Sequence, residues 1–386
     1  MIPNPLSVVD LSFNKSDRKR DSFMLKGALA KHGFDAWRHC FTGVGRTSGE
    51  KRSFMLEYYC VNPQLAEDEP VFAEDGRKPS YLCVRAVVLG EGGSVLNRYF
   101  TWDATSTGEE MDLLISAEDC FLSETRTMGR IEVGPQDREK DSDRYPDVGR
   151  IVWDLRIDKR IAFNLGYTTS GPLRSTYIMN AFWHTEGMKT CYSGTIVWNG
   201  EEYQVEADSS DGIADKVWGK DPGDKWAFVG CSDLISKKRG KLSNSAFTFG
   251  QGMRIQVGPI DTLDEAIGGV YLEGDTYEFN FSKVWTLTQN RVKIKKKSNW
   301  VLFSMIEETP TTRVRVKILI SEQSIKRTLL ETPSGDRRKI LYAGRGKAEL
   351  ILERKKISLR NKWTWEKEDI LKGDNVYVSY MDKKSR

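Results

Sequence analysis

Short runs of alternating apolar and polar residues fill most of this chain, and turn-forming residues separate them. Five runs are rich in aromatic and β-branched residues and are short enough for single strands: RSFMLEYYCVNP (52–63), SYLCVRAVVLG (80–90), VLNRYFTW (95–102), GRIVWDLRI (149–157) and STYIMNAFWH (175–184). Strands repeated at this spacing, with glycine-rich turns between them, are typical of β-sandwiches and β-barrels.

The clearest hairpin is GTIVWNGEEYQVEA, at residues 194–207. Asn199 and Gly200 supply the two positive-φ positions of a type I′ turn between two alternating runs. Three more hairpins are predicted, at LGEGGSV (89–95), YLEGDTYEF (271–279) and TPSGDRRKI (332–340). Helical periodicity is scarce, and its candidates are DSFMLKGALAKHG (21–33), TGEEMDLLIS (107–116) and the segment after Trp365. We therefore expect an all-β protein with few short helices.

The length of 386 residues is too great for one ordinary core, so we expect two domains. A polar loop, SKKRGKLSNS (236–245), separates two strand-dense halves of the chain. We place the boundary shortly after Trp226. The prediction is an N-terminal β-sandwich or barrel domain over 1–228 and a C-terminal, basic β-barrel domain over 229–386.

Several features of the composition predict a cytoplasmic protein. No apolar run approaches the roughly 18 residues that cross a bilayer, and the first twenty residues lack the apolar region of a signal peptide. The six cysteines form no C-x-x-C pair, and three histidines offer no zinc-binding spacing. We expect free, mostly buried thiols and no metal site.

The net charge of +4 hides an uneven distribution. Residues 291–386 hold 25 Lys and Arg against 12 Asp and Glu, which is +13, so the rest of the chain carries −9. A basic region of this kind can face anionic lipid or nucleic acid. The structural interpretation, which we favour here, is that these lysines cover a solvated strand face or protect a sheet edge.

Motifs for cofactor-dependent chemistry are missing from the sequence. The segment AGRGKA (343–348) lacks the upstream spacing and the Ser or Thr of a phosphate-binding loop. No G-x-S-x-G nucleophile elbow occurs, and no serine context supports a triad with any of the histidines. We therefore expect no cofactor and no nucleic-acid partner.

Three stretches carry a resemblance to a known family: HGFDAWRHCFTG (32–43) with the strand that follows it, YIMNAFWHTEGMKTCYSGTIVWNGEEY (177–203) and DSSDGIADKVWGKDPGDKWAFVGC (208–231). In this order they resemble the tocopherol cyclase family, roughly over residues 33–231. Its S-F-x-x-E-x-x-N-P strand is matched, with slightly different spacing, by Ser53, Phe54, Glu57, Asn62 and Pro63. Its K-x-W-G turn and K-W-x-x-V-x-C strand are matched by Lys216, Trp218, Gly219, Lys225, Trp226, Val229 and Cys231. Arg38 stands where the family often has Tyr, and Val217 where the cyclases carry Asn.

The resemblance implies two packed lipocalin-like β domains, as in the related carotenoid 1,2-hydratase-like proteins and fungal lipocalin-like Diels–Alderases. It also implies a cofactor-independent enzyme that cyclises, hydrates or isomerises a lipophilic, isoprenoid-type substrate by acid-promoted chemistry. The alternative is a carrier or sensor of a hydrophobic ligand without catalysis. Peripheral contact of the basic C-terminal part with an anionic membrane is compatible with either function.

Acid-promoted chemistry on a double bond needs a proton donor and a site that stabilises a tertiary cation. Asp215 is the candidate acid, since burial raises the pKa of a carboxyl group, and Asp211 is the competing choice. His184 is a candidate for the acid itself or for the residue that orients the acid. Tyr192 is the candidate that completes the hydrogen-bonding wall of the site. The candidate ligand-binding residues are Trp37, Trp183, Trp218, Trp226 and Lys216.

Each candidate also has a purely structural interpretation. Asp211 and Asp215 can cap backbone N–H groups in an Asx-turn around Gly212. His184 can be a core histidine with one satisfied nitrogen, and the tryptophans can simply pack in the core. Lys216 can hold the loop through a salt bridge, because a buried lysine without a partner is costly.

Overall fold

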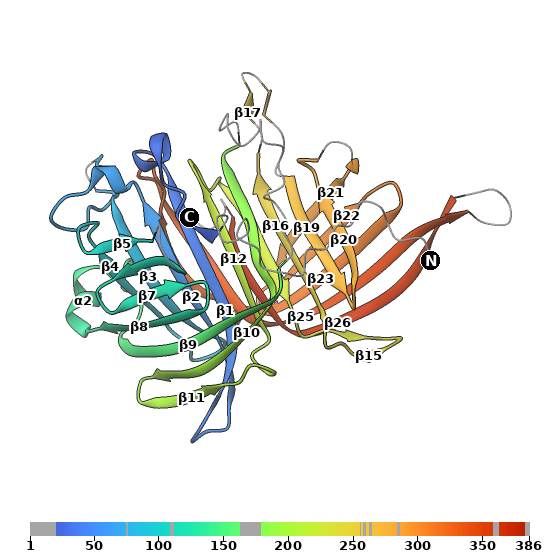
Figure 1. The fold of residues 1–386 in the computed structure, drawn as a ribbon, viewed down its shortest axis with the longest axis horizontal. Coiled ribbons are helices and arrows are strands. Elements are labelled where there is room, and N and C mark those ends of the chain that lie inside the picture. Colours follow the sequence, from blue (N-terminus) through green and yellow to red (C-terminus); the bar gives the residue numbers. More distant parts are fainter. Residues whose placement is uncertain are drawn as a thin grey trace.

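The computed structural model describes residues 21–74, 76–108, 112–162, 179–254, 256–257, 260–261, 265–283, 286–357 and 363–382. These residues form two twelve-stranded sheets and one small two-stranded sheet. The large sheets make a closed barrel and a half-barrel that lie side by side (Figure 1). The expected all-β fold with two packed units and few short helices is confirmed.

The first sheet uses the N-terminal half of the chain. Its order is β4-β3-β2-β1-β11-β10-β9-β8-β7-β6-β5, and β12 pairs with both β1 and β10. Its strands are β1 Phe34–Gly45, β2 Lys51–Val61, β3 Tyr81–Leu89, β4 Val95–Phe100, β5 Thr105–Thr107, β6 Leu113–Ala117, β7 Cys120–Ser123, β8 Arg126–Val133, β9 Gly149–Ile161, β10 Ala181–Trp198, β11 Glu201–Val205 and β12 Gly212–Gly219. The sheet curls on itself, since Arg98 of β4 donates a hydrogen bond to the Arg130 carbonyl of β8.

The second sheet uses the C-terminal half. Its order is β20-β19-β16-β13-β26-β25-β23-β22-β21, with β14, β15 and β24 attached beside this path. Its strands are β13 Lys225–Cys231, β14 Ile235–Ser236, β15 Gly240–Lys241, β16 Ser245–Met253, β19 Glu265–Leu272, β20 Asp275–Asn280, β21 Gln289–Lys296, β22 Trp300–Glu308, β23 Thr312–Ser321, β24 Lys326–Glu331, β25 Arg337–Ile357 and β26 Trp363–Asp382. The small sheet pairs β17 Gln256–Val257 with β18 Ile260–Asp261. The expected domain boundary at residue 228 lies within β13.

The predicted hairpins are present. Asn199 (φ 50°) and Gly200 (φ 90°) form the turn between β10 and β11, as positive-φ residues of a type I′ turn should. Turns of the same left-handed character at Glu273 and Gly274 join β19 to β20. The hairpins between β3 and β4 and between β24 and β25 also occur where the turn residues indicate.

The three helical candidates are wrong in the parts that the structure describes. In the 21–33 segment, Gly27 takes a positive φ of 58° and only the short 3-10 helix η1 Gly27–Ala30 follows. Residues 113–117 form the strand β6, and the segment after Trp365 forms β26. In the described part of the chain, the other short helices are η2 Pro63–Leu65, α2 Pro135–Lys140 and η4 Glu322–Ser324. In the described residues, no helix is long and apolar enough to span a membrane.

Alternation along the strands fixes which residues enter the core. In β9, GRIVWDLRIDKRI, the buried side chains are Ile151, Trp153, Leu155, Ile157, Lys159 and Ile161. The residues between them, apart from a half-buried Val152, are exposed charged side chains. One hydrophobic cluster fills the first sheet and continues across the contact with the second, and another fills the second sheet. The six cysteines are buried and free, as expected.

Candidate functional site

Three neighbouring strands, β1, β12 and β10, are buried on both of their faces. In antiparallel pairs the two partners point to the same side of the sheet, and successive residues alternate. Trp37, Lys216 and His184 are cross-strand partners and point into the first sheet, to what we call the inner face. Arg38 and Asp215 are partners one position away and point toward the second sheet, to the interface face.

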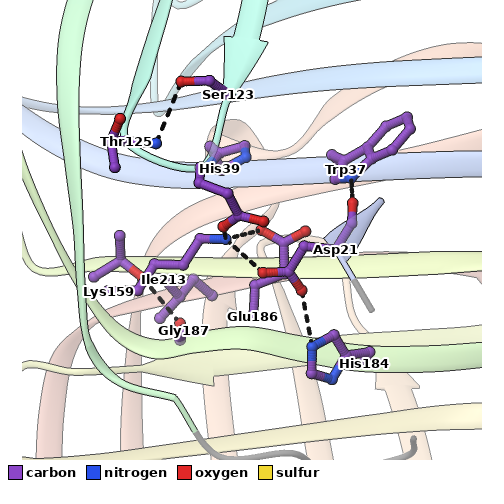
Figure 2. Close-up of polar contacts among 12 residues, drawn as sticks. Asp21, Trp37, His39, Ser123, Thr125, Lys159, His184, Glu186, Gly187 and Ile213 are labelled. Atoms are coloured by element: carbon purple, nitrogen blue, oxygen red, sulfur yellow. Dashed lines mark hydrogen bonds and ion pairs between the residues drawn. The ribbon is translucent and has the colours of Figure 1, made fainter. Parts of the chain in front are cut away.

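Five buried charged or titratable side chains gather on the inner face, and we call them the inner charge cluster: Asp21, Glu124, Lys159, His184 and Glu186. Lys159 is at its centre (Figure 2). Its Nζ atom lies 2.8 Å from Asp21 Oδ2, 2.7 Å from Glu124 Oε2 and 3.1 Å from Glu186 Oε2. His184 Nε2 lies 3.0 Å from Asp21 Oδ1. One lysine therefore faces three carboxyl groups in a space that water does not reach.

Burial and mutual repulsion separate the acidities of these groups. Burial raises the pKa of Glu186 to about 8, with Lys159 opposing the rise and Asp21 and Glu124 adding to it. Burial likewise raises the pKa of Glu124 to about 7. Asp21 behaves oppositely, since Lys159 and His184 outweigh the effect of burial and hold its pKa below the ordinary value. Asp21 is thus the ionised partner of Lys159, and Glu186 binds its proton near neutral pH.

Glu186 is also poorly satisfied by hydrogen bonds. Apart from the ion pair of Oε2 with Lys159, neither of its carboxyl oxygens has a hydrogen-bond partner among the described residues, although the side chain is buried. The same holds for His39 Nε2, whose ring lies close to the cluster in Figure 2. Burial, with the nearby Lys159, lowers the pKa of His39 to about 3, so the ring is neutral. Its Nδ1 atom lies 2.9 Å from the Tyr192 hydroxyl, and that hydroxyl donates to the Ile213 carbonyl at 3.1 Å.

Trp37 and Lys216 lie beside the inner charge cluster and are held there by further contacts. The Trp37 indole N–H donates to the Asp21 carbonyl at 2.7 Å. Lys216 forms a salt bridge with Asp35, with 2.6 Å between Nζ and Oδ1, and its ammonium lies 3.4 Å from the centre of the Trp37 ring. The salt bridge expected for Lys216 is therefore present. Cation–π contact with Trp37 compensates further for burying the lysine.

The interface face is organised by Arg38. Its guanidinium donates two hydrogen bonds to Asp215, at 2.8 Å and 2.6 Å. The Trp183 indole N–H donates a third to the same carboxylate at 2.9 Å. The guanidinium also lies over the Phe228 ring, 4.2 Å from its centre. Asp215 therefore accepts three hydrogen bonds as a carboxylate and belongs to a buried ion pair that spans β1 and β12.

A second buried ion pair lies next to the first. Arg85 donates to Glu57, and the Tyr342 hydroxyl of the second sheet donates to Glu57 Oε2 at 2.8 Å. Arg85 also donates to the Tyr342 hydroxyl at 2.9 Å. These contacts connect the two sheets through charged groups that water does not reach, so each group depends on its partner.

Between the two sheets lies a pocket of about 460 Å³. Its apolar lining comes from both sheets and includes Phe34, Tyr59, Val217, Trp226, Phe228 and Met253. The polar groups at its wall include Arg38, Glu57 and Gln251. A second pocket of about 370 Å³ shares Arg38 and Phe228 with the first and reaches Asp215 and Tyr342. Mostly apolar walls with a few fixed polar groups are typical of small-ligand sites.

The structure divides the predicted site residues between these two places. His184, Tyr192, Trp37 and Lys216 lie on the inner face, together with Trp218, whose ring stacks on Phe182 at 5.6 Å. Asp215 and Trp183 lie on the interface face, and Trp226 lies opposite them on β13 of the second sheet. Trp183 and Trp226 both contact Phe228. His184 and Asp215 thus point to opposite sides of the sheet and do not share one site. Asp211, the competing acid, has a positive φ of 44° and pairs with Lys51 at the surface.

Four members of the inner charge cluster were not among the sequence candidates: Asp21, Glu124, Lys159 and Glu186. Lys159 had a detectable signal, because it occupies the apolar phase of the strict alternation in β9. A charged residue in that phase predicts a buried charge with a partner. Asp21 and Glu124 lie outside strands and have no such pattern.

Comparisons with known proteins identify no family. No protein-family model matches the chain, and no curated protein matches it. A protein of unknown function from the DUF3598 family of Nostoc punctiforme aligns at 9% identity over 90% of this chain and 95% of its own, with a TM-score of 0.11. The outer membrane channel DcaP of Acinetobacter baumannii aligns at 7% identity over 91% and 96%, with a TM-score of 0.12. At these TM-scores neither structure informs the function of this chain.

Proposed function

We propose that the protein binds a lipophilic, isoprenoid-type molecule between its two sheets and converts it, without a cofactor, by acid-promoted cyclisation, hydration or isomerisation. The observation that carries the binding step is the composition of the pocket between the sheets, whose walls are mainly apolar and aromatic. An isoprenoid tail buries apolar surface there, and burial of that surface supplies the affinity. Arg38 and Glu57 are the charged groups available to orient a polar end.

The chemical step requires protonation of a carbon–carbon double bond and stabilisation of the resulting cation. Aromatic rings stabilise cations at their faces, and Tyr59, Trp226 and Phe228 line the pocket. Phe228 already binds the Arg38 guanidinium in this way. The Asp215 carboxylate, in the adjoining pocket, adds a negative charge near the same ring. In the proposed step Asp215 enters protonated, gives its proton to the double bond, and regains a proton when the cation is captured by a hydroxyl group or water or loses a neighbouring proton.

A specific observation favours the alternative function of a carrier. Asp215 accepts three hydrogen bonds from Arg38 and Trp183, and this arrangement suits a carboxylate rather than a carboxylic acid. A carrier needs the same pocket and no proton donor. The two functions therefore differ in what Asp215 must do.

Incubation of the purified protein with a prenylated quinol, followed by mass spectrometry of the extract, tests both functions. Conversion by the wild type that is lost in Asp215→Asn of β12, and retained in the matched Asp211→Asn just before that strand, would support the enzyme. Retention of the unchanged quinol by the wild type and both variants would support the carrier. If no lipophile binds, measured by quenching of tryptophan fluorescence, both functions are rejected. The cytoplasmic location stays a prediction.

A further inference from the structure

One outward face of the second sheet is strongly basic. The strand registers align three neighbouring rows of side chains across β21, β22, β23, β25 and β26. These rows contain six exposed basic residues, which we call the basic face: Arg291, Lys293, Lys295, Lys317, Lys347 and Lys372. In the middle row Glu349 lies between Lys317 and Lys372. A further basic residue in these rows, Arg315, is paired with Glu353.

The charges of the basic face are concentrated and uncompensated. Strands lie about 4.8 Å apart and alternate residues about 6.8 Å apart, so five strands and three rows cover about 19 by 14 Å. Within the part of the chain that the structure describes, none of the six residues forms a salt bridge. Six positive charges against one negative charge in this area create a positive potential that attracts an anionic partner.

Protection of the sheet edge does not explain this arrangement. Lysines on an edge strand prevent pairing with other chains, and this accounts for Lys293 and Lys295 on β21, the last strand of the sheet order. Lys317, Lys347 and Lys372 lie on β23, β25 and β26, each of which has hydrogen-bonded neighbours on both sides. These three positions have no free edge to protect, so their charge calls for another explanation.

Exposed apolar side chains lie among these lysines. Leu319, on the row of Lys347, is 46% exposed, and Ile235 of β14, the cross-strand partner of Lys372, is 44% exposed. Anionic membranes attract lysines to the headgroups and accept aliphatic side chains at the boundary of the acyl chains. A nucleic acid backbone offers phosphates but no place for leucine and isoleucine. The combination of lysines and exposed aliphatic side chains therefore fits a lipid surface better than it fits a nucleic acid.

We propose that the basic face docks the protein onto the surface of an anionic lipid bilayer. The phosphate and carboxylate groups of the lipids contact the six basic side chains, and Leu319 and Ile235 enter the interfacial region. The contact is peripheral and reversible. It does not depend on the proposed function, because the pocket and the basic face are different parts of the molecule.

Flotation of the full-length protein with vesicles tests this proposal. We compare vesicles of phosphatidylcholine alone with vesicles that also contain phosphatidylserine, at low and at high salt. Binding is expected only to the anionic vesicles and to weaken at high salt, because salt screens the attraction. Each basic residue near an anionic surface contributes about a fivefold change in affinity. The triple variant Lys293→Gln, Lys317→Gln, Lys372→Gln should bind about a hundredfold more weakly.

The matched control removes three exposed lysines from the first half of the chain, by Lys31→Gln, Lys78→Gln and Lys140→Gln. It has the same net charge as the triple variant and should bind the anionic vesicles like the wild type. Leu319→Ser should weaken binding a few-fold without changing its salt dependence. Thermal melting of all variants checks that they are folded, which exposed substitutions should leave unchanged.

Several outcomes would overturn the proposal. These are equal binding to both vesicle types, no binding to either, or an equal loss in the triple variant and the control. A short DNA duplex is added as a competitor. If the wild type binds the duplex and not the vesicles, and the triple variant loses the duplex, the basic face is a nucleic-acid surface instead.

Discussion

The inner face and the interface face of β1, β12 and β10 are separated by one sheet, yet they bury charge in different ways. On the inner face one lysine faces three carboxyl groups, two of which have raised pKa values. On the interface face Arg38 and Asp215 form a one-to-one pair with fixed bidentate geometry. The inner charge cluster therefore depends on proton binding, whereas the interface pair depends on the fit of two rigid groups.

The difference shows why adjacent motif residues need not share a function. Lys216 and Val217 are consecutive, but one points to the inner face and the other lines the pocket between the sheets. A motif such as K-x-W-G thus supplies residues to two places at once. Substitutions on the two faces should consequently have separable effects.

The largest effect is expected when the cation of the inner charge cluster is removed. Lys159→Met leaves three carboxyl groups buried without their common partner, and the free energy of unfolding should fall by about 4–5 kcal/mol. Denaturant unfolding at neutral pH measures this loss. Lys140→Met, on the exposed helix α2, is the control and should change stability by less than about 0.5 kcal/mol. A loss below about 1 kcal/mol for Lys159→Met would mean that water reaches the cluster.

A smaller loss of free energy of unfolding is expected when the ion pair of the interface face is broken. Asp215→Leu leaves Arg38 buried without its carboxylate and should cost about 3 kcal/mol. Adding Arg38→Met replaces the broken pair by two apolar side chains, which should restore most of the lost stability. Denaturant unfolding of the wild type, the two single variants and the double variant gives the coupling free energy between Arg38 and Asp215. Additive effects would show that the pair contributes no specific interaction.

The pH dependence that distinguishes the inner face is the smallest effect when it is measured per pH unit. The pKa of Glu186 rises from about 4.5 in the unfolded chain to about 8 in the folded protein. Its contribution to stability is therefore complete below pH 4.5 and is lost as the pH rises through 8. In that window the wild type should lose up to about 1 kcal/mol per pH unit more than Glu186→Gln.

The free energy of unfolding, measured at several pH values for the wild type and for Glu186→Gln, gives the slope of stability against pH for each protein. Asp215→Asn, on the interface face, should keep the slope of the wild type although its stability is lower. Parallel curves for the wild type and Glu186→Gln would exclude Glu186 as the titrating group.

The strands and turns of this fold were predictable because their determinants are local. Alternation defines β9, and Asn199-Gly200 defines the turn between β10 and β11. The apolar spacing in residues 21–33 predicts a helix, but the contacts of Asp21 with Lys159 and His184 fix that segment against the barrel core. Tertiary contacts there outweigh local propensity.

The candidate site was predictable only in part. Trp183, Trp226 and Asp215 were selected from a motif, and they do lie at the contact between the sheets. The role of Arg38 was not visible, because its partner Asp215 is 177 positions away in the sequence. Pairings at such separation depend on the register of the closed sheet, which no local pattern specifies.

The order of strands in the second sheet has a consequence for how the chain is made. β13 is flanked by β16 on one side and by β26 on the other, and Lys225 of β13 is the register partner of Asp382. During synthesis β13 lacks one neighbour until β26, Trp363–Asp382, has been made. All strands of the first sheet, by contrast, have been made once Gly219 has emerged. The half that contains the inner charge cluster thus has all its described strands before β26 of the other half has been made.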